Sequence, residues 1–325
     1  MFSPSTNVVL LRGASTARLW SLDTRTITTL ANQVDSARFS PDGNSILTVE
    51  NDNTAHLRDL SGKELAHFAA GHEINTAIVL ADNQSVLSAD LGNLMQLWSL
   101  DGQPQGEEKP LGGAVDPDMP PIDSMIGSPT QAQAVLLMTD GPAWLWSADA
   151  DPVQLGVEED ADLTAENAAF SPDGKLLSVG YDNGRIEIWD TAQPEKEPTV
   201  LAGHFSWINS LEFNPDGSRL LSASADRTAR IWSLDGKPLA SLNDHTDAVL
   251  NAHFSKDGST IITASTDDTA RLWSLGERAI AALETLQPLA QLLARLYVAQ
   301  VFFLSGLTKL RDWDITLALF QDEYH

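Results

Sequence analysis

The heptapeptide TARIWSL at residues 228–234 is the strongest indicator of the fold, because close copies of it recur along the chain. TARLWSL stands at residues 16–22 and again at residues 269–275. Weaker copies centre on Trp98, Trp146 and Trp189, and one more has Arg58 in place of the tryptophan. The aligned positions are 20, 58, 98, 146, 189, 232 and 273, so that successive copies lie 38, 40, 48, 43, 43 and 41 residues apart. A period near 40 with an aromatic residue at a fixed point indicates a β-propeller.

Each repeat predicts four short antiparallel strands, which form one blade. An apolar strand ending in Phe leads through a tight turn into a second strand, such as residues 218–224, and then into the Trp strand. A short fourth strand follows, often after Asp-Gly, as in residues 235–240. Pro presets φ, Asp bonds its own backbone and Gly accepts a positive φ, so the tight turns have a physical basis. The best copies of this turn are SPDG at 40–43 and 171–174, NPDG at 214–217 and SKDG at 255–258.

Charge and composition narrow the class of partner. The 325-residue chain has a formal net charge of −25 and a pI of about 4.4. Such a chain repels phosphate backbones, and no basic stripe offsets this, so we expect protein partners and no nucleic acid. The absence of cysteine excludes disulfides, thiolate catalysis and Cys-ligated metals. Residues 1–6 lack the charged and apolar regions of a signal peptide.

The repeats resemble the WD-repeat (β-transducin-like) family over roughly residues 1–284. Their Thr-Ala-Arg-x-Trp-Ser motif is similar to that of bacterial members. The most specific residues are Gly203-His204, FNPDG at 213–217, SASAD at 222–226 and Trp232. In that family a His, a Ser or Thr, an Asp and the Trp form a hydrogen-bonded tetrad. The resemblance implies two such tetrads here: His204, Ser222 or Ser224, Asp226 and Trp232, and then His245, Thr263 or Ser265, Asp267 and Trp273.

His204 and Asp226 could instead form a catalytic pair, but the same set recurs in the next repeat. A catalytic site is normally built once on its fold, so we interpret the tetrads as structural. The sequence contains no phosphate-binding loop, no paired-His metal motif and no nucleophile elbow. We therefore predict no enzyme activity, no catalytic residue, no metal and no cofactor.

The predicted fold is all-β: a seven-bladed propeller over residues 1–284 with a C-terminal α-helical tail over 285–325. The first blade is incomplete, because residues 1–4 correspond only to the end of a first strand. The six other blades are complete, the last fourth strand being residues 278–283. Residues 101–121 and 157–162 interrupt the period, and both are expected in loops between the fourth strand of one blade and the first strand of the next.

Two sets of residues are candidates for partner binding. Phe205 and Trp207 follow the Gly-His pair at the edge of the expected interaction face, where they serve either as binding anchors or as packing for a neighbouring loop. The acidic loops could attract a basic partner or remain simply solvated, and their spacing matches no known Ca²⁺ loop. Their residues are Asp116, Asp118, Glu158, Glu159, Asp160 and Asp162.

The tail has a different pattern, with leucines at helical spacing over residues 286–310 and an almost continuous apolar stretch from Leu296 to Leu304. It is long enough to span a bilayer, although Arg295 would cost about 2.5–3.5 kcal/mol at mid-membrane. Arg295, Gly306 and Lys309 make the tail similar to the first transmembrane helix of DoxX-type membrane proteins. The alternative is a soluble helix that covers the open edge of the first blade.

Two functions follow from these patterns. The first is a non-enzymatic protein-interaction scaffold that displays loops to protein or peptide partners. The second is a membrane-tethered regulatory or assembly module, fused to a DoxX-like, redox-associated membrane domain that is mostly missing from this chain. Both place the propeller in the cytoplasm, and the second tethers it through residues 286–310 to the inner face of the cell membrane.

Overall fold

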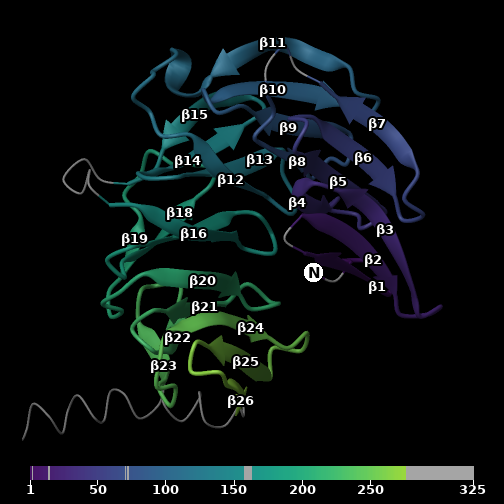
Figure 1. Ribbon diagram of the computed structural model, residues 1–325. Coiled ribbons are helices and arrows are strands. Elements are labelled where there is room, and N and C mark those ends of the chain that lie inside the picture. Colours follow the sequence, from purple (N-terminus) through teal and green to yellow (C-terminus); the bar gives the residue numbers. More distant parts are fainter. Residues whose placement is uncertain (2, 14, 70, 72, 157–162, 276–325) are drawn as a thin grey trace, which may run out of the picture. The chain divides into compact units, whose positions relative to one another are not determined.

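The computed structural model describes residues 1–275, apart from residues 2, 14, 70, 72 and 157–162. The chain divides into two units, Met1–Trp273 and Ser274–His325, and the description below concerns the first. The described residues are almost entirely strands and turns, arranged in seven antiparallel sheets. This arrangement is consistent with a β-propeller, and we name the sheets blades 1 to 7 in chain order (Figure 1).

The blades have the following strands. Blade 1 contains β1 (Val8–Arg12), β2 (Thr16–Ser21) and β3 (Thr26–Asn32); blade 2 contains β4 (Val34–Phe39), β5 (Ser45–Glu50), β6 (Ala55–Asp59) and β7 (Glu64–Phe68). Blade 3 contains β8 (Thr76–Val79), β9 (Ser85–Ala89), β10 (Leu94–Ser99) and β11 (Pro104–Pro110); blade 4 contains β12 (Ile122–Gly127), β13 (Gln133–Met138), β14 (Ala143–Ser147) and β15 (Ala150–Gln154).

The remaining strands belong to the three C-terminal blades. Blade 5 contains β16 (Ala165–Phe170), β17 (Leu176–Tyr181), β18 (Ile186–Asp190) and β19 (Thr199–Leu201); blade 6 contains β20 (Ile208–Phe213), β21 (Arg219–Ser224), β22 (Ala229–Ser233) and β23 (Pro238–Leu242). Blade 7 contains β24 (Val249–Phe254), β25 (Thr260–Ser265) and β26 (Ala270–Ser274). The fourth strand predicted at 278–283, the predicted boundary at 284 and the predicted helical tail lie outside the described residues.

The start of the chain lies beside β1, as expected for the end of a first strand. The Met1 amino group donates to Leu10 O over 2.9 Å, and Leu10 N donates to Met1 O over 2.7 Å. Ser3 N donates to Val8 O over 2.8 Å. Met1 and Ser3 therefore satisfy part of the edge of β1, although the described residues of blade 1 form only three strands.

The predicted tight turns form as their residue types dictate. In blade 5, Ser171 Oγ donates to Asp173 Oδ1 over 2.7 Å, and the same carboxylate oxygen accepts from Lys175 N over 3.1 Å. Gly174 has a φ of +72°, and a Cβ there would lie 2.2 Å from Thr130 Oγ1 of blade 4. The turn thus needs glycine both for its backbone conformation and for its close approach to the neighbouring blade.

The hydrophobic core lies between consecutive blades. Separate clusters of buried apolar side chains join blades 1 and 2, 2 and 3, 3 and 4, 4 and 5, and 5 and 6. Two asparagine side chains, one just before β8 and one on β20, add polar links between blades: Asn75 Nδ2 donates to Ile122 O over 2.7 Å, and Asn209 Nδ2 donates to Val249 O over 2.9 Å. Blades 2 to 5 therefore pack against a neighbouring blade on both of their faces.

The interruption at residues 101–121 is only partly the loop that the sequence predicts. Residues 104–110 form β11, the fourth strand of blade 3, and Leu111–Gly113 form the short 3₁₀ turn η1. Prolines are tolerated on such an outermost strand because one of its edges carries no ladder partner. The expectation that the whole stretch follows the fourth strand was therefore wrong. Among the described residues, no helix is long and apolar enough to cross a bilayer.

Candidate functional site

Blade 6 contains a buried polar network that joins the loop before β20 to β21 and β22. Trp232 Nε1 donates to Ser222 Oγ over 2.8 Å, and Ser222 Oγ lies 2.7 Å from His204 Nε2. His204 Nδ1 lies 2.7 Å from Asp226 Oδ2. The structure thus brings together His204, Ser222, Asp226 and Trp232, all buried, and resolves the alternative between Ser222 and Ser224.

The chain of donors fixes the tautomer of His204. Because the Asp226 carboxylate can only accept, the Nδ1 proton of His204 points to Asp226, and Nε2 of the neutral ring then accepts from the Ser222 hydroxyl. Burial lowers the pKa of His204, although the hydrogen bond with Asp226 acts in the opposite direction. Burial alone would raise the pKa of Asp226, but the hydrogen bonds from His204 and Thr228 outweigh it and lower that pKa to about 2. The network therefore holds a neutral imidazole beside a carboxylate.

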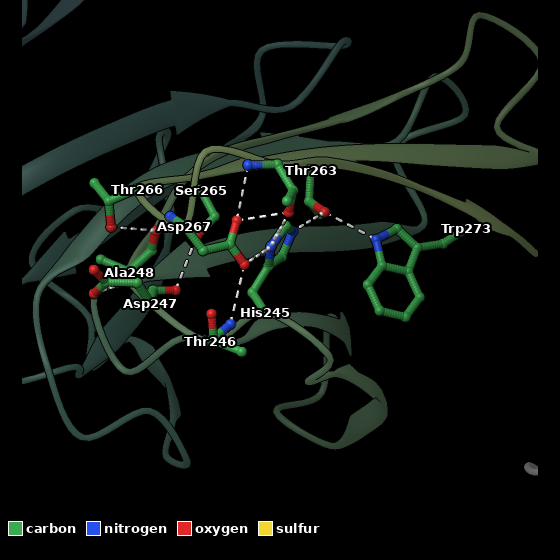
Figure 2. A network of polar contacts seen from close by, with 10 residues as sticks. His245, Thr246, Asp247, Ala248, Thr263, Ser265, Thr266, Asp267 and Trp273 are labelled. Carbon is green, nitrogen blue, oxygen red and sulfur yellow. Dashed lines mark hydrogen bonds and ion pairs between the residues drawn. The ribbon is translucent and has the colours of Figure 1, made fainter.

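Blade 7 repeats this network, and Figure 2 shows it. Trp273 Nε1 donates to Thr263 Oγ1 over 2.9 Å, and Thr263 Oγ1 lies 2.7 Å from His245 Nε2. His245 Nδ1 lies 2.9 Å from Asp267 Oδ2, and hydrogen bonds from Thr269 and His245 hold the pKa of Asp267 below its ordinary value.

Ser224 and Ser265 were the alternative candidates for the two networks, and they form hydrogen bonds with backbone groups instead. Ser224 Oγ donates to Ser206 O over 3.0 Å and accepts from Asp226 N over 3.0 Å. Ser265 Oγ likewise donates to Asp247 O over 3.0 Å, as Figure 2 shows. In each blade the serine thus connects the end of its second strand, β21 or β25, to the loop before the first strand, β20 or β24.

In two other blades, charged residues take the place of the network, a role that the sequence did not reveal. In blade 2, Arg58 takes the Trp position, donates to Thr48 Oγ1 and lies 2.7 Å from Glu50 Oε1. In blade 5, Glu187 is 1% exposed and accepts from Trp189 Nε1 over 3.2 Å and from Tyr181 Oη over 2.7 Å. The sequence signal for these interactions is a charged residue on an otherwise apolar strand. Arg58 stands at the aligned position, and Glu187 stands two positions before it.

Phe205 and Trp207 are displayed on the loop between β19 and β20, at 71% and 56% exposure. The loop is held from several sides: His204 by its tetrad, Ser206 O by Ser224, and Trp207 O by Ala225 N over 3.0 Å. A Cβ at Gly184 of blade 5 would lie 2.7 Å from the His204 carbonyl carbon, so that turn also packs closely against the loop. The two exposed aromatic residues thus flank a well-anchored backbone.

The acidic candidates are only partly within the described residues. Asp116 and Asp118 are exposed in the loop after η1, and Asp118 N donates to Asp116 Oδ1 over 2.9 Å. Glu158, Glu159, Asp160 and Asp162 lie outside the described residues. Among the residues that the structure describes, no group of three or more His, Asp or Glu side chains is placed to hold a metal ion.

Comparison with known families supports the reading of the C-terminal repeats. Residues 166–190, 195–233 and 236–274 match the family described as WD domain, G-beta repeat. Three stretches of the chain therefore match WD40 repeats. The matched residues run from β16 to β26, and they include all four members of both networks. The predictions of a bacterial type and of a DoxX-like tail stay predictions.

Curated relatives are similar to this chain over part of its length. It is 29% identical over 223 residues to the serine-threonine kinase receptor-associated protein of Gallus gallus, covering 67% of this chain and 60% of that protein. It is 31% identical over 121 residues to the Protein LST8 homolog of Drosophila melanogaster, covering 35% and 38%. It is 34% identical over 91 residues to apoptotic protease-activating factor 1 of Danio rerio, covering 25% and 7%. The chain thus spans less than two thirds of each of these relatives.

Proposed function

We propose that this WD40 chain is a non-enzymatic interaction scaffold whose loop 203–207 contacts a protein or peptide partner. The observation that carries the proposal is the exposure of Phe205 and Trp207 on a loop whose backbone is tied to two blades. Large aromatic side chains provide most of the binding free energy in many interfaces. An anchored backbone also reduces the entropy lost on binding.

The acidity of the chain supports a basic partner. Its formal net charge of −25 includes Asp116 and Asp118 on an exposed loop. Opposite charges raise association rates more than they raise affinity, so binding to a basic partner should slow as salt concentration rises. The WD-repeat relatives fit the same general role of binding proteins.

The experiment compares partner capture by two double variants of the full chain. Phe205→Ala with Trp207→Ala should reduce the captured partner at least about tenfold, while the free energy of unfolding changes by less than about 0.5 kcal/mol. The control, Ile27→Ala with Leu65→Ala, removes equally exposed apolar side chains from blades 1 and 2 and should capture normally. Equal capture by both variants, or an unfolded Phe205/Trp207 variant, would remove the support for this surface.

A second proposal concerns residues 286–310, whose apolar pattern favours membrane association of a cytoplasmic scaffold. Expression of residues 1–325 and 1–276, followed by alkaline carbonate washing of the membranes, tests it. We expect only the longer chain to stay with the membrane pellet. Recovery of both chains in the soluble fraction would contradict the tether without affecting the role of loop 203–207.

A further inference from the structure

A cavity of about 620 Å³ lies between blades 3 and 4. Its walls continue the core cluster that joins the two blades. On blade 4, Trp144 and Trp146 line it, and since they lie two residues apart on β14, both side chains are on the same side of the strand. On blade 3, β9 and β10 contribute the apolar side chains of Leu87, Met95 and Leu97. The volume lies within the range of ligand-binding pockets, which are mostly apolar with a few polar groups.

Bulges and small residues border the rest of the cavity. On β11, residues 106–108 stand opposite the single residue Gln96 of β10. On β15, residues 151–152 stand opposite Trp146. Five of the lining residues have no side chain beyond Cβ, namely Gly106, Gly112, Gly113, Ala148 and Ala150. A Cβ at Gly106 or Gly113 would meet no atom within 4 Å, so the space beside these glycines is open.

The indole of Trp146 lacks the partner that its counterparts have. In blades 3, 6 and 7 the Trp Nε1 donates to a hydroxyl ten residues earlier in the sequence, on Ser88, Ser222 or Thr263. In blade 4 that position is Leu136, and Trp146 Nε1 has no acceptor among the described residues. Because Trp146 lines the cavity, a bound molecule that carries a hydrogen-bond acceptor can satisfy this N–H.

The chemistry of the lining indicates a flat and uncharged ligand. Indole rings pack favourably against other aromatic rings, and the thioether of Met95 does so as well. Glu107 and Asp151 line the cavity together with Lys109, so an anion would meet more negative than positive charge. The apolar walls also disfavour a molecule with a formal charge, because burying an unpaired charge is costly.

We propose that the cavity between blades 3 and 4 binds a flat, uncharged heteroaromatic molecule of about two or three fused rings that carries a hydrogen-bond acceptor. Its rings pack between the two tryptophans of β14 and the apolar side chains of β9 and β10. Its acceptor receives the N–H of Trp146. This small-molecule site is separate from loop 203–207 and does not depend on the scaffold function.

The test uses the full chain labelled with 5-fluorotryptophan and three small molecules, followed by fluorine NMR. The probe is coumarin, which is flat and uncharged and has a carbonyl acceptor. Indene keeps the fused rings without an acceptor, and δ-valerolactone keeps the lactone carbonyl without an aromatic ring. Trp144→Phe and Trp146→Phe assign the two signals. We expect saturable shifts of both signals with coumarin at concentrations up to about 2 mM, and affinities at least about fivefold weaker for both controls. No shift with coumarin, or equal affinities for all three compounds, would overturn the proposal.

A first variant tests the hydrogen bond. Trp146→Phe keeps an aromatic ring in the wall but removes the N–H. Coumarin should therefore bind about fivefold more weakly, with the Trp144 signal as the readout, whereas indene should bind as it does to the wild type. Equal changes for coumarin and indene would contradict the proposed hydrogen bond.

A second variant tests the aromatic wall. Trp144→Leu should weaken coumarin binding at least about fivefold, with the Trp146 signal as the readout. Trp207→Leu makes the same change on an exposed residue outside the cavity and should leave coumarin binding unchanged, which distinguishes this site from loop 203–207. The signals of Trp98 and Trp232 show whether each variant keeps its fold. Normal coumarin binding by a folded Trp144→Leu variant would overturn the assignment to this cavity.

Discussion

At the scale of single residues, the Ser222 hydroxyl is the link on which the blade 6 network depends. It accepts from Trp232 and donates toward His204, and both partners are buried. In blade 3, Ser88 Oγ accepts from Trp98 Nε1 over 2.8 Å, and no histidine extends that pair among the described residues. Among the described residues, Ser222 therefore links two buried side chains and Ser88 binds one.

This difference predicts unequal costs of removing the two hydroxyls. Ser222→Ala leaves an indole N–H and an imidazole nitrogen without partners and should lower the free energy of unfolding by about 2–4 kcal/mol. Among the described residues, Ser88→Ala leaves a single indole N–H without its partner, and it should cost about 1–2 kcal/mol. Urea unfolding of the two variants measures the difference. Equal losses would mean that the His204 link contributes nothing to stability.

His204 also predicts a dependence of stability on pH. Its pKa is lowered in the folded chain, mainly by burial, so the unfolded chain takes up a proton first as the pH falls. The stability contributed by the neutral imidazole is therefore present above the ordinary pKa near 6.5 and decreases below it. Between pH values of about 7.5 and 5.5 the wild type should lose up to about 1.4 kcal/mol more than His204→Gln. Parallel pH profiles of the two proteins would contradict this assignment.

The sequence could predict which residue types form the networks but not which serine links them. Ser222 and Ser224 both lie on β21 two residues apart, so they point to the same side of the strand. Only the register, in which Ser222 pairs with Arg230 and Leu220 with Trp232, places the Ser222 hydroxyl under the indole. Spacing alone carries no such information.

At the scale of elements, blade 2 shows that a different interaction can hold the same strands together. Arg58 and Glu50 form an ion pair whose side chains are 10% and 16% exposed, and Glu64 lies 3.8 Å from the same guanidinium. The pair joins β5 to β6 as Ser222 joins β21 to β22. Its formation explains how the repeat tolerates the loss of its Trp.

Removing one partner of this ion pair should cost more than removing both. Glu50→Ala leaves a largely buried guanidinium and should lower the free energy of unfolding by about 2–3 kcal/mol, somewhat less than for a fully buried pair because Glu64 remains near. Glu50→Ala with Arg58→Met should recover at least half of this loss. Thermal unfolding in a double-mutant cycle measures the coupling, and additive losses would show that the pair is not the stabilising unit.

The long repeat at residues 101–121 was the element that sequence reasoning placed least well. Its prolines and glycines are typical of a loop, and a loop was predicted. Pro104 and Pro110 instead bound the outermost strand, where a missing N–H is tolerated, and Gly106 forms the bulge. Whether such residues make a loop or an edge strand depends on pairing with β10, which is a property of the folded blade.

At the scale of the whole molecule, stability comes from faces that consecutive blades cover for one another. The period of about 40 residues predicted this stacking, because a single blade cannot bury its own apolar faces. Ile231 of β22 is completely buried, whereas Leu272, at the same position of β26, is 74% exposed. Leu221 of β21 and Ile262 of β25 show the same contrast, at 0% and 48% exposure. Among the described residues, one face of blade 7 thus has no blade that covers it.

This contrast predicts opposite outcomes for two chemically similar substitutions. Ile231→Ala removes a fully buried side chain and should lower the free energy of unfolding by about 2–4 kcal/mol. Leu272→Ala removes an exposed one and should change it by less than about 0.5 kcal/mol. Urea unfolding of the full chain, with hydrogen exchange of β22 and β26, separates local from global effects. A loss at Leu272 as large as that at Ile231 would show that another surface covers this face of blade 7 in solution.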